Sequence, residues 1–386
     1  MAEPVICAVA RTPVGKFRGA LAGYSAVELG VLAVNELLSR ADIDPASGLI
    51  DEVLFGQVLQ AGAGQAPARQ VALGAGLPYS TPCTTINKVC GSSLKAVMIA
   101  ASAIRAGEHE VVIAGGMESM TNAPHIVSNA NRGEDVPYSD LISSMVHDGL
   151  WDAYNDEHMG CTGETVATEF GISRADSDAF AARSHRLANQ AWEEGSIDWE
   201  AFALPELARD EGIDAAVTEE TLASLQPVFP TEGQVTAGNA SQLSDGGAAV
   251  LVASAEAAER NGWPVLARII DQNTDGVEPE RVMAAPMPTV NDMLQRNGLS
   301  IDDIDIVEHN EAFASASCAV AQELGILDEK FNPHGGAVAI GHPLGATGAR
   351  VLITLINALR KRGGHRGVVT ICLGGGNAVA MLIECD

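Results

Sequence analysis

A cysteine placed directly before a predicted helix is the first residue with the setting of a reactive group. Cys90 lies in the run NKVCGSS, residues 87–93, ahead of apolar residues at helical spacing. The positive end of a helix dipole and the free amides of a first turn lower a thiol pKa and can hold an oxyanion. The neighbouring glycine and serines leave room for a ligand. A nucleophile and a buried structural cysteine explain this residue about equally well.

A glycine-rich turn late in the chain carries a histidine. Residues 341–348 read GHPLGATG, without the Gly-Lys-Ser/Thr of a phosphate-binding P-loop. A lone histidine is more often structural than catalytic. If His342 shares a pocket with Cys90, however, the two form an activated thiol nucleophile.

A second cysteine follows a short apolar strand predicted at residues 368–371. Cys372 opens the turn CLGGG, residues 372–376. Its thiol is a candidate acid or base, and the backbone amide of Gly374 is a candidate oxyanion donor. An incidental cysteine in a tight turn is the alternative.

An amide side chain follows another predicted strand, residues 304–307. Asn310 lies in the run HNEAFA and can hold a water or a carbonyl group, although capping of the next helix explains it equally well. His309 and Glu311 do not have the spacing of a zinc site, so we expect no metal.

The elements that must position these residues repeat along the chain. Strands are predicted at residues 5–9, 51–57, 111–114 and 245–253, and helices at residues 26–40, with a Ser25–Glu28 capping box, and 92–106. Residues 35–53 have an echo at 291–307, and residues 91–112 have one at 345–369, an offset of about 255 residues. We interpret this as an internal duplication. Two such α/β halves packed about a pseudo-dyad bring the helix start at Cys90 to the turn at His342.

The segment between the halves has a different, aromatic-rich character and one long predicted helix at residues 174–194. We therefore predict an N-terminal half from residues 1–120 plus 245–265, an inserted loop or lid domain at 121–244, and a C-terminal half at 266–386.

Composition restricts the function classes. The 386 residues include 50 acids against 23 bases, of which five are lysine, and the net charge of −27 disfavours free nucleic acid as a partner. We favour a protein adapted to high salt over an ordinary acidic one. Seven scattered cysteines without a C-x-x-C pair disfavour a disulfide framework. No signal peptide and no run of 18 apolar residues is found, so we expect a cytoplasmic protein without a membrane-spanning helix.

Taken in order, the motifs of this chain resemble those of the thiolase family, in its biosynthetic short-chain group. They are RTPVGKF (11–17), CGSS (90–93), GGMESM (115–120), TAGNAS (236–241), NEAFA (310–314), GHP (341–343) and CLGGG (372–376). The resemblance implies a five-layered αβαβα fold of two duplicated halves with an inserted loop domain. It also implies a homotetramer whose contacts involve the loop at residues 123–140.

The resemblance further implies ping-pong condensation of two acetyl-CoA to acetoacetyl-CoA plus CoA, and the reverse thiolysis. Cys90 would become acylated, His342 would take its proton, and Cys372 would deprotonate the second acetyl-CoA. One oxyanion hole would use His342 and a water on Asn310, and the other would use the amides of Cys90 and Gly374. The coenzyme A thioesters are substrates, and no cofactor is implied. The implied contacts to pantetheine and to the acyl group are Ser241, His158, Met159, Ala312, Phe313 and Met283.

Two departures from the family pattern bear on the substrate. Residues 215–226 contain no lysine or arginine near the expected nucleotide end of CoA, so the phosphates would bind weakly at low salt or rely on Arg183, Arg186 or Lys16. Residues 283–286 read MAAP in place of Met-Gly-x-Gly-Pro, which leaves the acyl chain length open.

Four rival functions use the same or related chemistry. A 3-ketoacyl-CoA thiolase of broader chain length is the nearest. Cys372 and the Asn310-Glu311 pair disfavour a ketoacyl synthase, and the presence of Cys90, His342 and Cys372 together disfavours a non-catalytic lipid carrier. A cysteine-dependent thioesterase would use water in place of the second acyl-CoA.

Overall fold

The computed structural model describes residues 2–127, 135–229 and 233–386, and it contains the same succession of elements twice. The N-terminal copy comprises β1 (Pro4–Arg11), α1 (Ala26–Arg40), β3 (Glu52–Gly56), α2 (Pro67–Gly74), β4 (Cys83–Ile86), α3 (Ser92–Ala106), β5 (Val111–Ser119) and β10 (Ser244–Ser254). The C-terminal copy comprises β11 (Ala267–Gly276), α8 (Pro286–Arg296), β12 (Ile306–His309), α9 (Ala314–Leu324), α11 (Thr347–Arg362), β13 (Arg366–Leu373) and β14 (Asn377–Glu384). A single parallel bridge between Val307 and Phe331 stands where β3 pairs with β4 in the first copy.

The strands of both copies form one continuous ladder in the order β12-β13-β14-β11-β1-β10-β5-β3-β4, and the short strand β2 (Gly15–Lys16) pairs with β10. Among the described residues, two strand pairings join the sheets of the two copies, Val5 with Arg268 and Ile6 with Ala267. The ladder therefore consists of two sheets that join through a short antiparallel pairing of β1 with β11.

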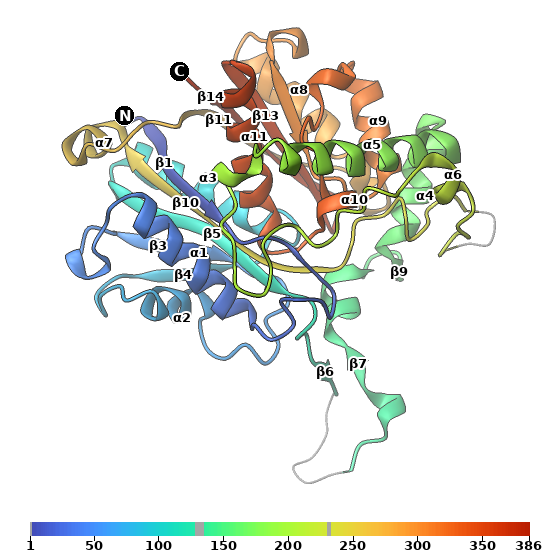
Figure 1. The fold of residues 1–386 in the computed structure, drawn as a ribbon, viewed down its shortest axis with the longest axis horizontal. Helices are drawn as coiled ribbons and strands as arrows, with labels where there is room; N and C mark the ends of the chain where they lie inside the picture. The colour runs from blue at the N-terminus through green and yellow to red at the C-terminus, as the bar shows by residue number, and fades with distance from the viewer. Residues whose placement is uncertain (1, 128–134, 230–232) are drawn as a thin grey trace.

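Helices and sheets alternate in five layers (Figure 1). The helices α3 and α11 lie in the middle, where their apolar side chains share one core with the inner faces of both sheets. On the outside, α1 and α2 cover the N-terminal sheet, and α8 and α9 cover the C-terminal sheet. The predicted αβαβα fold of two duplicated halves is confirmed.

The central helices are buried on most sides because they lie between the two sheets. In α11, every residue from 347 to 359 is buried. Residues 89–106, which include α3, are long and apolar enough to cross a membrane by length and composition alone. This window contains Lys95 and Arg105, so it is not an uninterrupted run of apolar residues, and it coincides with the core helix of the middle layer.

Most predicted boundaries agree with the structure to within two residues. Ser25 and Glu28 form both bonds of the predicted capping box at α1. The strand predicted at residues 111–114 is longer than expected, because β5 continues through Gly115 and Gly116 to Ser119. A Cβ atom on Gly115 would lie 2.2 Å from the carbonyl oxygen of Ala248, so glycine here permits close pairing with β10 and does not end the strand.

The segment between β5 and β10 is the predicted insertion. It contains β6 (His125–Ile126), η2 (Tyr138–Asp140), β7 (Ile142–Ser143), η3 (Met145–Leu150), β8 (Trp151–Asp152), β9 (Glu157–His158), α4 (Met159–Phe170), α5 (Arg174–Glu193), η4 (Ile197–Trp199) and α6 (Glu219–Ala223). Shorter elements complete the two halves, namely η1 (Pro45–Ser47), α7 (Ala255–Asn261), η5 (Pro279–Ala284), η6 (Ile301–Asp303), η7 (Asp328–Lys330) and α10 (Ala337–Ile340).

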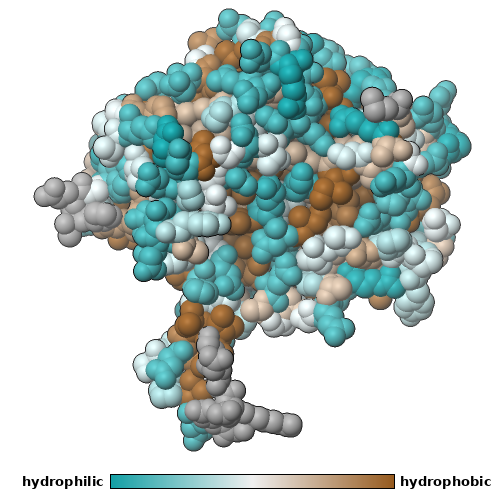
Figure 2. Space-filling model, turned by 180° about the vertical axis from the view of Figure 1, so that it is seen from behind, coloured by the Kyte–Doolittle hydropathy of each residue, from teal (hydrophilic) through white to brown (hydrophobic). Residues whose placement is uncertain are grey.

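The β6–β7 hairpin projects from the body of the molecule as an arm (Figures 1 and 2). Its exposed apolar side chains include Tyr138, Ile142 and Val127. The loop predicted to make tetramer contacts, residues 123–140, falls in this arm, and residues 128–134 of it lie outside the described residues.

Candidate active site

The turns at the ends of the two halves meet at one cavity. Cys90, His342, Cys372 and Gly374 all line it, together with Val89, Gly149, Leu150, Met159, Ser241, Val282, Met283, Ala312, Phe313, Leu344 and Leu373. Asn310 lies behind the histidine, and its Nδ2 atom is 3.4 Å from Nε2 of His342. The structure thus brings all five predicted catalytic residues together, from four separate stretches of sequence.

The two central helices touch at their N-terminal ends, as the pseudo-dyad requires. The backbone amide of Ala349 in α11 donates a 2.9 Å hydrogen bond to Oγ of Ser93 in α3. A Cβ atom on Gly348 would lie 2.4 Å from the amide nitrogen of Leu94, so only glycine permits this crossing. The helix starts that carry Cys90 and follow His342 are therefore fixed relative to each other.

The backbone before the nucleophile candidate is strained. Val89 has φ of +45°, a conformation that β-branched residues rarely adopt and that costs about 1–3 kcal/mol. Two bonds of the Ser92 hydroxyl hold the turn: it accepts from the amide of Lys88 at 2.8 Å and donates to the carbonyl of Val89 at 2.6 Å. This turn places Cys90 at the start of α3 and facing the cavity.

His342 is held through its backbone and through one ring nitrogen. Its amide donates to the carbonyl of Gln242 at 3.0 Å, and its Nδ1 atom lies 2.6 Å from Oγ1 of Thr347. Gly341 before it has φ of +111°, and a Cβ atom there would lie 2.2 Å from Oγ of Ser244. Burial, with a further contribution from Arg350, lowers the pKa of His342 to about 3. The imidazole is therefore neutral and able to accept a proton.

Both thiols have pKa values above that of an ordinary cysteine. Burial raises the pKa of Cys90, the neighbouring Cys372 adds to the increase, and the amides of Cys90 and Gly374 oppose it. Burial also raises the pKa of Cys372 to about 12. The expectation that the helix start lowers the Cys90 pKa was wrong, because removal from water outweighs the amides and the dipole. Both sulfurs are therefore protonated at rest.

Glu118, which was not among the predicted site residues, holds the turns around the cavity together by hydrogen bonds. Glu118 is fully buried and accepts hydrogen bonds from the amides of Val58, Leu59 and Gly345, at 3.0, 3.2 and 3.0 Å. Burial raises the pKa of Glu118 to about 7, against the effect of these three donors. Its place in the GGMESM motif was visible in the sequence, but the distant amides that it binds were not.

A second cavity continues the first towards the surface. The two share Leu150, Met159, Ser241, Phe313, His342 and Leu344. The outer cavity is also lined by His158 and Phe229, and it reaches the exposed side chain of Val228. All six predicted substrate-contact residues line one or both cavities. An elongated ligand can therefore extend from Cys90 to the surface.

Several of the side chains that line this passage come from the insertion and from η5. The imidazole of His158 stacks on Phe229 with ring centroids 4.8 Å apart, and its Nδ1 atom accepts the amide of Gly160 at 3.0 Å. Burial lowers the pKa of His158. Met283 packs on the inner thiol, with its sulfur 3.6 Å from the Cys372 sulfur. Leu150, at the end of η3, and Leu344 were not predicted, since a single apolar residue has no sequence pattern that separates it from core residues.

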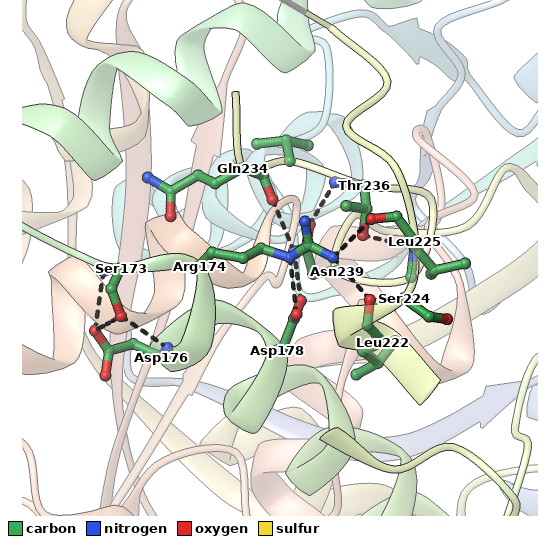
Figure 3. Close-up of polar contacts among 12 residues, drawn as sticks. Ser173, Arg174, Asp176, Asp178, Leu222, Ser224, Leu225, Gln234, Thr236 and Asn239 are labelled. Carbon is green, nitrogen blue, oxygen red and sulfur yellow. Dashed lines mark hydrogen bonds and ion pairs between the residues drawn. The ribbon is translucent and has the colours of Figure 1, made fainter. Parts of the chain in front are cut away.

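A polar network beside the passage fixes the loop that carries Ser241 (Figure 3). Asn239 accepts from the amide of Thr236 at 2.8 Å and donates to Asp178 at 2.8 Å. Arg174 in turn donates to Asp178 at 2.7 Å and to the carbonyl of Leu222 at 2.7 Å. The network therefore ties residues 236–241 to both α5 and α6.

The three residues suggested for the CoA phosphates do not line this passage. Arg183 and Arg186 line a separate pocket on α5 together with Glu219 and Glu220, and Lys16 lines neither cavity. One nitrogen of Arg183 already donates to the carbonyl of Phe331 at 2.7 Å. Their role in phosphate binding stays a prediction.

All seven cysteines are free thiols.

Comparison with known proteins agrees with this geometry. Residues 4–256 match the thiolase N-terminal domain, and residues 263–385 match the thiolase C-terminal domain. The chain is 46% identical to the acetyl-CoA acetyltransferase of Pseudomonas aeruginosa and 44% identical to that of Cupriavidus necator. Each alignment covers 100% of this chain and 100% of the relative.

Two solved structures superpose on the whole chain with a TM-score of 0.95. They are human mitochondrial 3-ketoacyl-CoA thiolase in complex with CoA, 36% identical with 98% of that chain covered, and the acetyl-CoA acetyltransferase of Bacillus anthracis, 37% identical with 99% covered. With both thiolase domains present, the chain belongs to the thiolase family of acyl-transferring enzymes.

Proposed function

We propose that this protein is an acetyl-CoA C-acetyltransferase that condenses two acetyl-CoA to acetoacetyl-CoA and CoA, and catalyses the reverse thiolysis. The observation that carries the proposal is the single cavity lined by Cys90, His342 and Cys372 at the inner end of a passage to the surface. Relatives of 44–46% identity that carry this name over their full length support the choice of substrate.

The first half-reaction acylates Cys90. Neutral His342 takes the proton of the thiol, the sulfur attacks the thioester carbonyl, and the CoA thiolate leaves. The leaving thiolate takes the proton of Cys372, whose resting pKa of about 12 falls once the His342 imidazolium has formed in the same cavity. The products are an acyl-cysteine, free CoA, a Cys372 thiolate and an imidazolium that stabilises this thiolate.

The second half-reaction forms the carbon–carbon bond. The Cys372 thiolate removes a proton from the α-carbon of a second acetyl-CoA, and the carbanion attacks the acyl group on Cys90. The Cys90 thiolate leaves and recovers its proton from His342, which restores the resting enzyme. Donors near each developing oxyanion are His342 with a water on Asn310, and the amides of Cys90 and Gly374.

The remaining expectations belong to the same proposal. Ser241, His158 and Met159 would contact pantetheine, and Met283, Ala312 and Phe313 would limit the acyl chain. We propose a homotetramer assembled through the β6–β7 arm, and activity in the cytoplasm. Sedimentation of the full chain and of a variant with Tyr138 and Ile142 changed to serine tests the assembly.

Intact-protein mass spectrometry with acetyl-CoA tests the two cysteine roles. Cys90→Ala should not be acetylated, whereas Cys372→Ala should acetylate slowly and lose condensation by about 100-fold or more. Cys318→Ala, a thiol on α9 that lines neither cavity, is the matched control and should retain both steps. Normal condensation by either Cys90→Ala or Cys372→Ala would contradict the proposal.

A further inference from the structure

Thr347 is a buried residue of the active-site region to which the proposed mechanism assigns no role. It is the first residue of α11, it is fully buried, and it does not line the cavity. Its hydroxyl oxygen lies 2.6 Å from Nδ1 of His342 and 2.9 Å from the carbonyl oxygen of Pro343. A threonine hydroxyl has one proton, so it can donate to only one of these two atoms.

The carbonyl decides which atom receives that proton. A carbonyl oxygen can only accept, and two oxygens 2.9 Å apart with no proton between them repel each other. The hydroxyl therefore donates to Pro343. Its lone pair then faces Nδ1 of His342, which must carry a proton to complete the 2.6 Å contact.

The other ring nitrogen lies beside an amide side chain. Nε2 of His342 is 3.4 Å from the side-chain amide nitrogen of Asn310. A neutral imidazole with its proton on Nδ1 has its lone pair on Nε2. We infer that Thr347 is a positioning residue that holds His342 in the Nδ1–H tautomer, so that Nε2 can accept the proton of Cys90.

The inference deepens the proposed function and rests on it. Proton transfer breaks the S–H bond of Cys90, leaves the electron pair on sulfur and forms an N–H bond at Nε2. The resulting imidazolium keeps its Nδ1–H bond to Thr347 and presents a new donor at Nε2 to the oxyanion. In the opposite tautomer Nε2 already carries a proton and the lone pair is on Nδ1 beside Thr347, so Nε2 cannot accept the Cys90 proton.

Single-turnover acetylation of Cys90, followed by mass spectrometry from pH 6 to 9, tests the inference. Thr347→Val removes the acceptor and should slow acetylation about 100-fold, with little change in the acetyl-CoA concentration at half-saturation. Thr347→Ser keeps the hydroxyl and should restore the rate to within about threefold. Thr354→Val is the matched control, because Thr354 is a buried threonine of the same helix that bonds to Glu200 and Arg350 instead.

Nitrogen NMR of histidine-labelled wild-type protein supplies an independent readout, with the His342 signals assigned by their loss in His342→Gln. We expect a protonated Nδ1 and an unprotonated Nε2. A protonated Nε2, or wild-type acetylation rates in folded Thr347→Val, would overturn the inference. If the wild type itself is not acetylated, the proposed function fails, and the NMR tautomer still decides the role of Thr347. If Thr347→Val does not fold, the tautomer in the wild-type spectrum and the acetylation rate of Thr347→Ser test the role of Thr347 instead.

Discussion

Burial governs the protonation of the side chains in and around the active site. It raises the pKa of both thiols and lowers that of His342, so the resting pair is neutral thiol and neutral imidazole. Charges then appear only when a substrate reacts in the cavity. In this arrangement the donors around the cavity stabilise charge in the reaction more than in the free enzyme.

Buried histidines also make the fold sensitive to acid. Burial lowers the pKa of His185 to about 4, below the value of about 6.5 for an unfolded chain. As the pH falls from about 6.5 to about 4, the unfolded chain therefore takes up a proton that the folded protein does not, and stability decreases. In His185→Gln, the slope of unfolding free energy against pH should be smaller by up to about 1.4 kcal/mol per pH unit.

Urea unfolding at half-unit steps from pH 7.5 to 5 measures this slope. His185 accepts the amide of Asp214 at 3.1 Å, and a glutamine carbonyl can replace that acceptor. The difference between the two proteins at pH 7.5 reports packing alone, since both side chains are neutral there. Parallel curves from pH 6.5 to 5 would show that His185 does not contribute to the acid sensitivity.

Among the elements, the turn after His342 depends on glycine in the opposite half. A Cβ atom on Gly116 in β5 would lie 2.0 Å from the carbonyl oxygen of Gly345, a backbone atom that cannot swing away. Gly116→Ala should therefore cost about 2–3 kcal/mol and slow acetylation of Cys90, because the turn that carries His342 must shift.

Urea unfolding and the acetylation rate together check this prediction. Gly23→Ala is the control, since a Cβ atom at Gly23 meets no other atom within 4 Å. Equal stability of the two variants would mean that the β5 strand can move away from the turn without cost.

How far the elements can be predicted depends on whether their cause is local. The capping box of Ser25 and Glu28 and the periodicity of residues 92–106 are local, and α1 and α3 were predicted with their observed bounds. The duplication placed His342 opposite Cys90 without any structure. The end of β5 was missed because Gly116 is required by a carbonyl from the other half, which is more than 200 residues away in the chain. Glu118 was missed for the same reason, because one of its partners is the amide of Gly345. The partners of Thr347 lie only four and five residues away, but no sequence pattern shows that its hydroxyl contacts the His342 ring.

At the scale of the whole molecule, the net charge of −27 is the dominant property. Repulsion among exposed carboxylates weakens the compact state in dilute buffer, and salt screens it. We expect the melting temperature to rise by about 5 °C or more between 0.1 and 2 M NaCl.

The melting experiment is repeated with a neutral osmolyte in place of NaCl. A rise with NaCl alone indicates screening of charge, whereas a rise with both solutes indicates stabilisation by solutes that are excluded from the protein surface. Acetyl-CoA binding should improve over the lower part of this range of NaCl concentration, because salt screens the repulsion between a protein with a net charge of −27 and an anionic ligand. Best stability in dilute buffer, with loss of fold in molar salt, would contradict adaptation to high salt.

The placement of Cys90 and His342 on equivalent turns of the two copies has a consequence for how such a site can arise. A pair of separate, identical chains would present the same residue on both turns, either two sulfurs or two imidazoles. Joining the copies in one polypeptide lets each turn specialise, so that one supplies the nucleophile and the other its proton acceptor. Covalent fusion of two similar units thus allows two different residues to face each other at the active site. Neither unit expressed alone would contain both Cys90 and His342.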